Sequence, residues 1–399
     1  MRAWAKPLAG LWEQASYSAG RFLFWVMAPA LATDAWDKIA LLSLLNLFMM
    51  MLYASIIGGP SFYRLVRGQP EEPAGMGALS AYLPCQAVIA ALSLIGPCGY
   101  ILLHPEAARA DPGFVALLVV LPWVSSAADW ARKTMILLGR QKGQGRRNLL
   151  FAGLWLAYAF WLALWPAPVG VEALALVFCG LTAVVYLPIS GVGRAAHRGG
   201  RAALAPFSVW RQYLVAGGLA YGLGNALFWM AIDSPALQDF VVLRNYLAPV
   251  LLLSLYIESY GALQMEAADQ KRRLVLRYLL GVGAATIAFS GGAYGVLRFG
   301  AGQAVDPVIF GFGAGITFLI AAIKLPTVYL RLRGQEHLVT LVYLMMVPLW
   351  PLAFAFGLLG RLPFAGLELL LGQYLVLALG LALAAAAPRL PWPKGVRVE

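Results

Sequence analysis

Two arginines lie inside long apolar stretches of this sequence, where charged side chains are rare. Arg21 lies eight residues after Glu13, and Arg244 lies five residues after Asp239. At 1.5 Å per helical residue, these separations are about 12 Å and about 7.5 Å. A guanidinium group donates hydrogen bonds in a planar fork that fits phosphate and carboxylate oxygens. The pair therefore predicts a site for an anionic group. The alternative is that each arginine reaches the nearer interface or a local carboxylate.

Further polar and aromatic side chains in these stretches are candidates for the same substrate site. Asn245 directly follows the second arginine and makes that position more polar. Asn46 and Asn225 are expected either to hydrogen-bond neighbouring helices or to contact a substrate. Trp25 and Trp229 fit packing or interface positions, and they would stack on a sugar only if they face a cavity.

Asp129 is a candidate coupling-ion site near the end of an apolar stretch. It precedes Arg132 and Lys133, and Lys133 lies four residues on, the spacing of a helical ion pair. A structural ion pair and a role in coupling are therefore both open interpretations.

The residue patterns of enzymes are missing from the sequence. The three histidines fit no metal site or acid/base arrangement, and no Gly-rich phosphate loop contains a lysine. The three cysteines lie in apolar stretches without metal-ligand spacing. No catalytic residue, metal or cofactor is expected. A membrane-embedded glycosyltransferase or acyltransferase remains the less favoured alternative.

The apolar stretches themselves indicate the class of protein. Hydrophobic residues make up 61% of the 399 residues and charged residues only 12%, whereas globular domains carry about 25% charged residues. A helix of roughly 20 apolar residues crosses a hydrocarbon core about 30 Å thick, and it satisfies its own backbone polar groups. The sequence predicts an all-α integral membrane protein of about twelve transmembrane helices, at residues 14–33, 38–62, 78–103, 113–138, 148–166, 171–193, 213–232, 240–264, 274–297, 307–330, 338–360 and 366–387.

The distribution of basic residues gives the orientation. With the N-terminus in the cytoplasm, 24 of the 30 Lys and Arg residues fall on the inner side and four on the outer side. This bias follows the positive-inside rule and predicts that both termini are cytoplasmic. Topology and contact with anionic membrane lipid account for the net charge of +12, so no nucleic-acid partner is expected. Arg2 and Lys6 before the apolar stretch 22–30 also imitate a cleaved signal peptide, and this alternative stays open.

Internal similarity indicates two halves. The tripeptide at 23–25 recurs at 227–229, and Tyr53 and Gly59 recur as Tyr256 and Gly261, at offsets of 202 to 204 residues. The expected organisation is an N-terminal six-helix half at 1–193, a basic cytoplasmic linker at 194–212 and a C-terminal six-helix half at 213–399. Parallel repeats of this kind typically enclose a central cavity that opens to each side in turn.

The pattern resembles the multidrug/oligosaccharidyl-lipid/polysaccharide flippase superfamily, specifically its bacterial polysaccharide and O-antigen flippase branch. The first expected helix, continuing through residues 34–37 into residues 39–53, resembles that family's opening hairpin, and residues 132–142 resemble its basic turn before the fifth helix. Residues 221–222, Asp233 and 244–246 resemble the start of its second half, and residues 366–383 resemble its closing helix. The likeness extends over essentially the whole chain, as a pattern rather than a diagnostic motif.

The resemblance implies transport of a polyprenyl-diphosphate-linked oligosaccharide from the cytoplasmic to the outer leaflet by alternating access. It places the chain in the bacterial cytoplasmic (inner) membrane, in the biosynthesis of cell-surface polysaccharide. Glycosyltransferases and a glycan polymerase are the expected protein partners. A drug or small-molecule exporter of the same superfamily is the alternative, although an exporter of cations would need acidic residues in its cavity.

Overall fold

The computed structural model contains helices only among the residues it describes, which confirms the all-α prediction for this part of the chain. The described residues are 12–13, 16–17, 20–21, 24, 36–58, 83–137, 141–164, 170–186, 207–230, 240, 243, 247, 250–251, 254, 257–258, 271–295, 298–299, 306–364 and 366–386.

Helices of the first part of the chain are α2 (Trp36–Tyr53), the π-helix η1 (Ala54–Gly58), α4 (Leu83–Ser93), α5 (Ile95–Leu103), α6 (Pro105–Ala110), α7 (Pro112–Leu137), α8 (Gln141–Leu164) and α9 (Val171–Tyr186). Helices of the second part are α11 (Phe207–Met230), α14 (Lys271–Gly295), α15 (Pro307–Leu332), α16 (Glu336–Leu344), α17 (Leu349–Ala355) and α18 (Leu367–Ala386). The start of α11 at Phe207 places the last six residues of the expected linker in a helix.

The described helices have the length and composition of a membrane protein. Five candidate spans are long and apolar enough to cross a bilayer: Pro112–Asp129, Val275–Gly295, Pro307–Leu332, Glu336–Ala355, which α16 and α17 form together, and Leu367–Ala386. Large apolar side chains also face outward, for example Leu102 at 80%, Ile287 at 77% and Phe160 at 66% exposed. A water-soluble monomer rarely exposes so much apolar surface, whereas a lipid-facing surface requires it.

Two expected spans are interrupted rather than continuous. The span 78–103 divides into α4 and α5 at Leu94, and the span 338–360 divides into α16 and α17 at residues 345–348. Proline lacks an N–H group and its ring collides with the preceding turn, so a helix tends to break there. Pro97 lies in the first turn of α5, and Pro348 caps α17. By contrast, α7 and α15 continue through Pro122 and Pro326.

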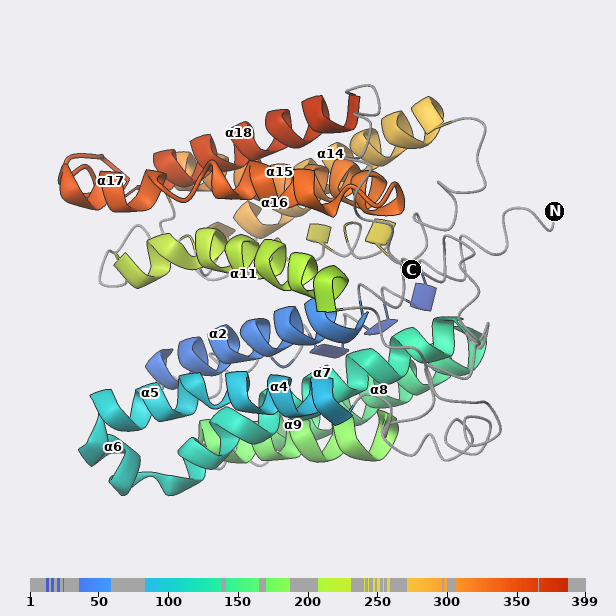
Figure 1. Cartoon of the computed structure of the whole chain (residues 1–399). Helices are drawn as coiled ribbons and strands as arrows, with labels where there is room; N and C mark the ends of the chain where they lie inside the picture. The colour runs from blue at the N-terminus through green and yellow to red at the C-terminus, as the bar shows by residue number, and fades with distance from the viewer. Residues whose placement is uncertain are drawn as a thin grey trace.

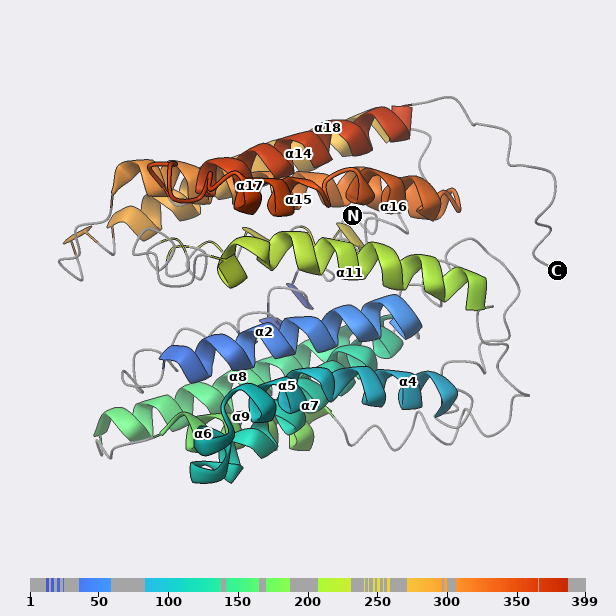
Figure 2. The same cartoon turned by 60° about the vertical axis from the view of Figure 1, so that its left-hand side comes forward.

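The described helices form two groups that meet at α2 and α11. Helices α2 to α9 lie together, α11 to α18 lie together, and both views show α11 next to α2 (Figures 1 and 2). The Tyr221 hydroxyl donates a hydrogen bond to the Leu44 carbonyl across this contact, at 3.1 Å. Gly217 of α11 permits this close approach because it has no side chain. A Cβ atom at this position would collide with the Ser55 hydroxyl group of η1.

An aromatic core holds the segment 12–24 against α8 and α9. Phe24 stacks on Phe178 at 4.3 Å between ring centroids, and Trp155 and Phe151 complete the cluster with edge contacts. All four side chains are at most 1% exposed. Burial of large aromatic side chains dominates core energetics. This cluster therefore fixes the position of the polar residues that precede Phe24 in the same segment.

Three charged residues join the starts of α2, α7 and α9. The Lys38 ammonium group contacts the Asp111 carboxylate and lies 2.5 Å from Glu172 Oε1. Asp111 also accepts a hydrogen bond from the Phe114 backbone N–H at 2.9 Å, which satisfies an N–H group at the start of α7. The hydrogen bond from Lys38 lowers the pKa of the Asp111 carboxyl group below its ordinary value.

We expect the contribution of Asp111 to stability to disappear in acid. Because its pKa is lower in the folded state, its stabilisation is complete above the unfolded-state value of about 3.9 and is lost as pH falls toward the folded-state value. The side chains are about one-third exposed, so the effect at pH 7 should be no more than about 1 kcal/mol. Thermal unfolding in detergent should show Asp111→Asn less stable than wild type at pH 7, and the difference should shrink as pH falls below about 4. A constant difference across this range would contradict the assignment.

Candidate functional site

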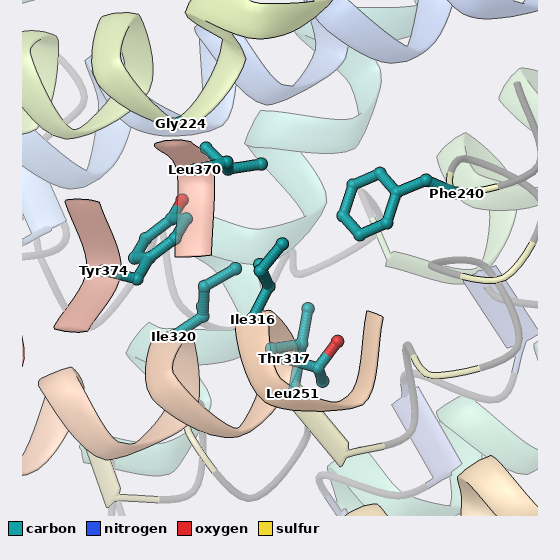
Figure 3. Close-up of a pocket in the computed structure, with 8 residues that line it drawn as sticks. All are labelled: Gly224, Phe240, Leu251, Ile316, Thr317, Ile320, Leu370 and Tyr374. Carbon is teal, nitrogen blue, oxygen red and sulfur yellow. The ribbon is translucent and has the colours of Figure 1, made fainter. Parts of the chain in front are cut away.

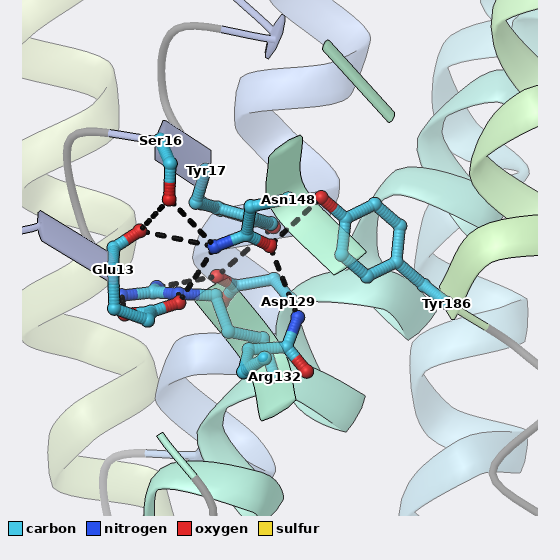
Figure 4. A network of polar contacts seen from close by, with 8 residues as sticks. Glu13, Ser16, Tyr17, Asp129, Arg132, Asn148 and Tyr186 are labelled. Carbon is cyan, nitrogen blue, oxygen red and sulfur yellow. Dashed lines mark hydrogen bonds and ion pairs between the residues drawn. The ribbon is translucent and has the colours of Figure 1, made fainter. Parts of the chain in front are cut away.

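A buried ion pair lies within the first group of helices, near the end of α7. Arg132 of α7 binds Glu13 through two parallel hydrogen bonds, Nε to Oε1 at 2.8 Å and an Nη atom to Oε2 at 2.9 Å (Figure 4). The side chains are 2% and 1% exposed. A charge buried this deeply is tolerated only with a partner of opposite sign and good hydrogen-bond geometry. The pair therefore fixes the segment around Glu13 to α7.

Asp129 adds a second carboxylate to this ion pair. Its Oδ1 atom lies 3.5 Å from a terminal nitrogen of Arg132, and it accepts a hydrogen bond from the Tyr17 hydroxyl at 3.4 Å. These distances exceed those of strong hydrogen bonds. The Asp129 side chain is 16% exposed, whereas that of Glu13 is 1% exposed. Asp129 is thus the more accessible carboxylate of the two.

Asn148 of α8 connects the ion pair to two further helices. Its amide nitrogen donates to the Glu13 backbone carbonyl at 3.0 Å and to Oε1 of the same residue at 3.1 Å. Its Oδ1 atom accepts from the Tyr186 hydroxyl of α9 at 3.0 Å and from Gln144 Nε2 at 3.1 Å. Ser16 Oγ lies 3.3 Å from the same amide nitrogen. One amide group therefore joins residues from the segment 12–24, α8 and α9 (Figure 4).

Arg21 lies beside this network with a different set of contacts. One terminal nitrogen donates to the Ser125 backbone carbonyl at 2.6 Å, and the other lies 3.8 Å from the Met50 sulfur. Its guanidinium carbon is 4.6 Å from the centroid of the Tyr17 ring, and that of Arg132 is 4.4 Å from the same centroid. Arg21 is half-buried, and no carboxylate among the described residues forms an ion pair with it. Within the described part of the chain, the carboxylates that balance its positive charge lie beyond ion-pair distance.

The balance of charge in the network depends on Asp129. Two arginines and two carboxylates sum to zero when all four are ionised. Protonation of Asp129 would leave these four groups, which include the half-buried Arg21, with one net positive charge. In a medium of low dielectric constant, such a change alters the attraction for an anion strongly. The charge of the network therefore depends on whether Asp129 is ionised.

The structure brings some of the predicted site residues together. Asn46 and Arg21 both contact the Met50 sulfur, with 3.8 Å from the Asn46 amide nitrogen. Asn46 is 6% exposed and lies on α2. Asn225 lies on α11, is 5% exposed and donates to the Tyr221 backbone carbonyl at 2.8 Å. The Oδ1 atoms of both asparagines are buried and have no hydrogen-bond partner among the described residues.

The remaining predicted residues have no described side chain. Trp25, Arg244 and Asn245 lie outside the described residues, and Trp229 lies in α11 with only its backbone described.

Asp129 pairs with Arg132 at the i,i+3 position. The side chain of Lys133, its expected i,i+4 partner, is not among those described.

Sequence reasoning missed most members of the network. Glu13 appears there only as the reference position for Arg21, and Asn148 and Tyr186 are not among the predicted site residues. One signal was present: Glu13, Ser16, Tyr17 and Arg21 recur at helical spacing, so they share one face of a helix. A polar face on an otherwise apolar membrane helix indicates buried polar partners.

The second group of helices contains simpler charged pairs. Lys324 of α15 lies 2.6 Å from Glu258, with side chains 34% and 25% exposed. Arg331 binds Glu336 through its Nε atom at 3.0 Å, near the inner end expected for α15. A small cavity of about 20 Å³ lies beside Ile316, Thr317 and Tyr374 (Figure 3). It has room for about one water molecule, which is too little for a sugar.

Comparison with known proteins identifies no family for this chain. No protein-family model matches the chain, and no curated protein matches it.

Proposed function

We propose that this chain is a flippase that moves a polyprenyl-diphosphate-linked oligosaccharide from the cytoplasmic to the outer leaflet of a bacterial cytoplasmic membrane. The observation that carries the proposal is the half-buried Arg21, which has no carboxylate partner among the described residues and lies beside the buried network of Glu13 and Arg132. Ionisable groups at membrane depth mark substrate or ion pathways. A guanidinium group at this position suits a diphosphate.

The proposed architecture consists of two six-helix halves, 1–193 and 213–399, around a central cavity. Support comes from the two groups of described helices, which contact each other through α2 and α11 (Figure 1). Each of these helices carries one of the predicted asparagines, Asn46 and Asn225, with a buried Oδ1 atom that has no partner among the described residues. In the proposal these oxygen atoms hydrogen-bond to sugar hydroxyls or to water when the halves separate.

The coupling role belongs to Asp129 in this proposal. Its contacts with Arg132 and Tyr17 are long, and its side chain is the more exposed of the two carboxylates. When Asp129 takes up a proton, the network gains positive charge and its attraction for an anionic head group increases. When Asp129 releases the proton, that attraction decreases. Proton uptake and release would thereby be linked to binding and release of the anionic lipid.

The direct test is transport by the purified protein in proteoliposomes. A polyprenyl-diphosphate oligosaccharide is placed in both leaflets, and a membrane-impermeant lectin measures how much of it reaches the outer leaflet over time. The proposal requires transport that is faster than in protein-free vesicles. Absence of lipid transport together with accumulation of a cationic dye would favour the exporter alternative. Cleavage or elongation of the oligosaccharide in the same vesicles would favour a membrane enzyme.

We expect Asp129→Asn to remove the proton dependence of transport. The amide has the shape of a protonated carboxyl group and does not titrate near neutral pH. An imposed proton gradient should therefore accelerate wild-type transport and leave the variant unchanged, while Asp129→Glu should retain part of the acceleration. Folding should be little affected because Arg132 keeps its two hydrogen bonds to Glu13.

The matched control for this experiment is Asp306→Asn. Asp306 caps α15 by accepting a hydrogen bond from the Val308 N–H at 2.8 Å, and asparagine caps helices equally well. This variant should respond to the gradient like wild type. Equal gradient responses in Asp129→Asn and wild type would remove Asp129 from the coupling step.

A further inference from the structure

A surface groove between α11 and α16 lies apart from the charged network. Its volume is about 270 Å³. On α11 it is lined by Arg211, Gln212 and Val215, and on α16 by His337, Thr340 and the two leucines that follow, Leu341 and Leu344. Both helices begin close to the groove, at Phe207 and Glu336.

The lining residues change from charged to apolar along both helices. On α11, Arg211 and Gln212 come first and Val215 follows one turn later. On α16, His337 comes first, Thr340 follows, and Leu341 and Leu344 come last. From His337 to Leu344 the helix rises by about 10 Å. The apolar residues face outward, with Val215 at 41%, Leu341 at 53% and Leu344 at 47% exposed. The groove thus has a polar mouth and an apolar wall.

The mouth of the groove is lined by basic and neutral polar side chains. None of the lining residues is acidic. Glu336 directly precedes His337, but its side chain is 4% exposed and Arg331 binds it with Nε–Oε distances of 3.0 and 3.2 Å. Arg211 and His337 are the basic side chains that line the mouth.

We propose that this groove binds an anionic phospholipid, with the phosphate at Arg211 and His337 and an acyl chain along Val215, Leu341 and Leu344. The order of charged, polar and apolar groups matches that of a lipid from its head group to its chain. Basic pockets between transmembrane helices on the cytoplasmic side are suited to anionic head groups. Arg211 belongs to the basic segment that the positive-inside rule assigns to that side. Since α11 also contacts α2, a bound lipid would stabilise the helix through which the two groups of helices meet.

The test is lipid titration of the full-length, delipidated protein in detergent, measured by native mass spectrometry. Phosphatidylglycerol and phosphatidylcholine with identical acyl chains are compared. Wild type should bind phosphatidylglycerol more tightly. Arg211→Gln should weaken that binding about fivefold, the usual effect of one basic residue near an anionic head group, and should leave phosphatidylcholine unchanged. Arg333→Gln, which removes an exposed arginine outside the groove, is the matched control and should bind as wild type does.

A second variant fills the groove without changing its charge. Val215→Trp places a large side chain against the apolar wall, and it should reduce retention of phosphatidylglycerol although Arg211 remains. Equal affinity of wild type for the two lipids would overturn the proposal. So would equal loss in Arg211→Gln and Arg333→Gln, which would indicate a general effect of surface charge. If Arg211→Gln does not fold, the result with Val215→Trp decides. The outcome is independent of oligosaccharide transport, because no glycan is present.

Discussion

Arg21→Ala should abolish most transport of the polyprenyl-diphosphate oligosaccharide while the protein still folds. A charge-assisted hydrogen bond contributes about 1.5–3 kcal/mol, so its loss should slow transport at limiting substrate by roughly 10- to 150-fold. Arg21→Lys keeps the charge but loses the planar fork, and it should give an intermediate rate. The described contacts of Arg21 are a backbone carbonyl, a thioether sulfur and an aromatic ring. Folding should therefore tolerate the change.

The control for Arg21→Ala is Arg298→Ala. Arg298 is exposed near the outer end expected for its helix and lies 5.9 Å from the Tyr294 ring. Its loss should leave lectin-measured transport unchanged. Arg244→Ala, at the second arginine predicted from the sequence, should resemble Arg21→Ala. Normal transport by Arg21→Ala, at an unchanged amount of folded protein, would exclude this arginine from the substrate site.

Glu13→Gln should destabilise the fold more than any other substitution discussed above. The change leaves the Arg132 guanidinium buried at 2% exposure with its principal counter-charge removed. Breaking a buried ion pair by removing one partner costs about 3–5 kcal/mol. The free energy of unfolding, measured by titration of mixed micelles with a denaturing detergent, should fall by that amount. Glu106→Gln, at an exposed residue of α6, should change it by less than about 0.5 kcal/mol.

A double variant separates the charge from the packing. Glu13→Leu with Arg132→Met replaces both partners by apolar side chains, and such replacements are often neutral or stabilising. The double variant should therefore be more stable than Glu13→Gln alone. It should also lose the proton dependence of transport, because Asp129 would no longer contact an arginine at position 132. Equal stability of Glu13→Gln and Glu106→Gln would show that the ion pair does not fix the segment 12–24.

The two largest effects concern different properties of one network. Arg132, Glu13 and Asn148 hold the segment 12–24 to α7 and α8 through short, buried contacts. Asp129 and Arg21 lie at its more accessible edge, with longer or uncharged contacts. In the proposed transport cycle the first set stays rigid and the second set changes charge or binds substrate. Movement then occurs between the two groups of helices, where Gly217 and Ser55 allow close approach.

The sequence by itself determined the all-α, apolar class of the chain and the approximate positions of most of the described helices. Runs of apolar residues of membrane-spanning length leave no other regular structure, because lipid offers no partner to backbone polar groups. The spans 113–138 and 307–330 accordingly agree with α7 and α15 within a few residues. The breaks near Leu94 and Pro348 were not predicted, because a proline interrupts some membrane helices and is accommodated in others.

Only the tertiary structure decided which polar residues meet. Glu13 and Arg132 are 119 residues apart and Glu13 and Asn148 are 135 apart, so neither pair has a local sequence signal. Arg21 and Asp129 were identified from their charge at membrane depth, since that criterion needs no partner. Their partners depend on how the segment 12–24 packs on α7, α8 and α9. The aromatic cluster of Phe24, Trp155 and Phe178 sets that packing through shape, which the order of residues along the chain does not encode locally.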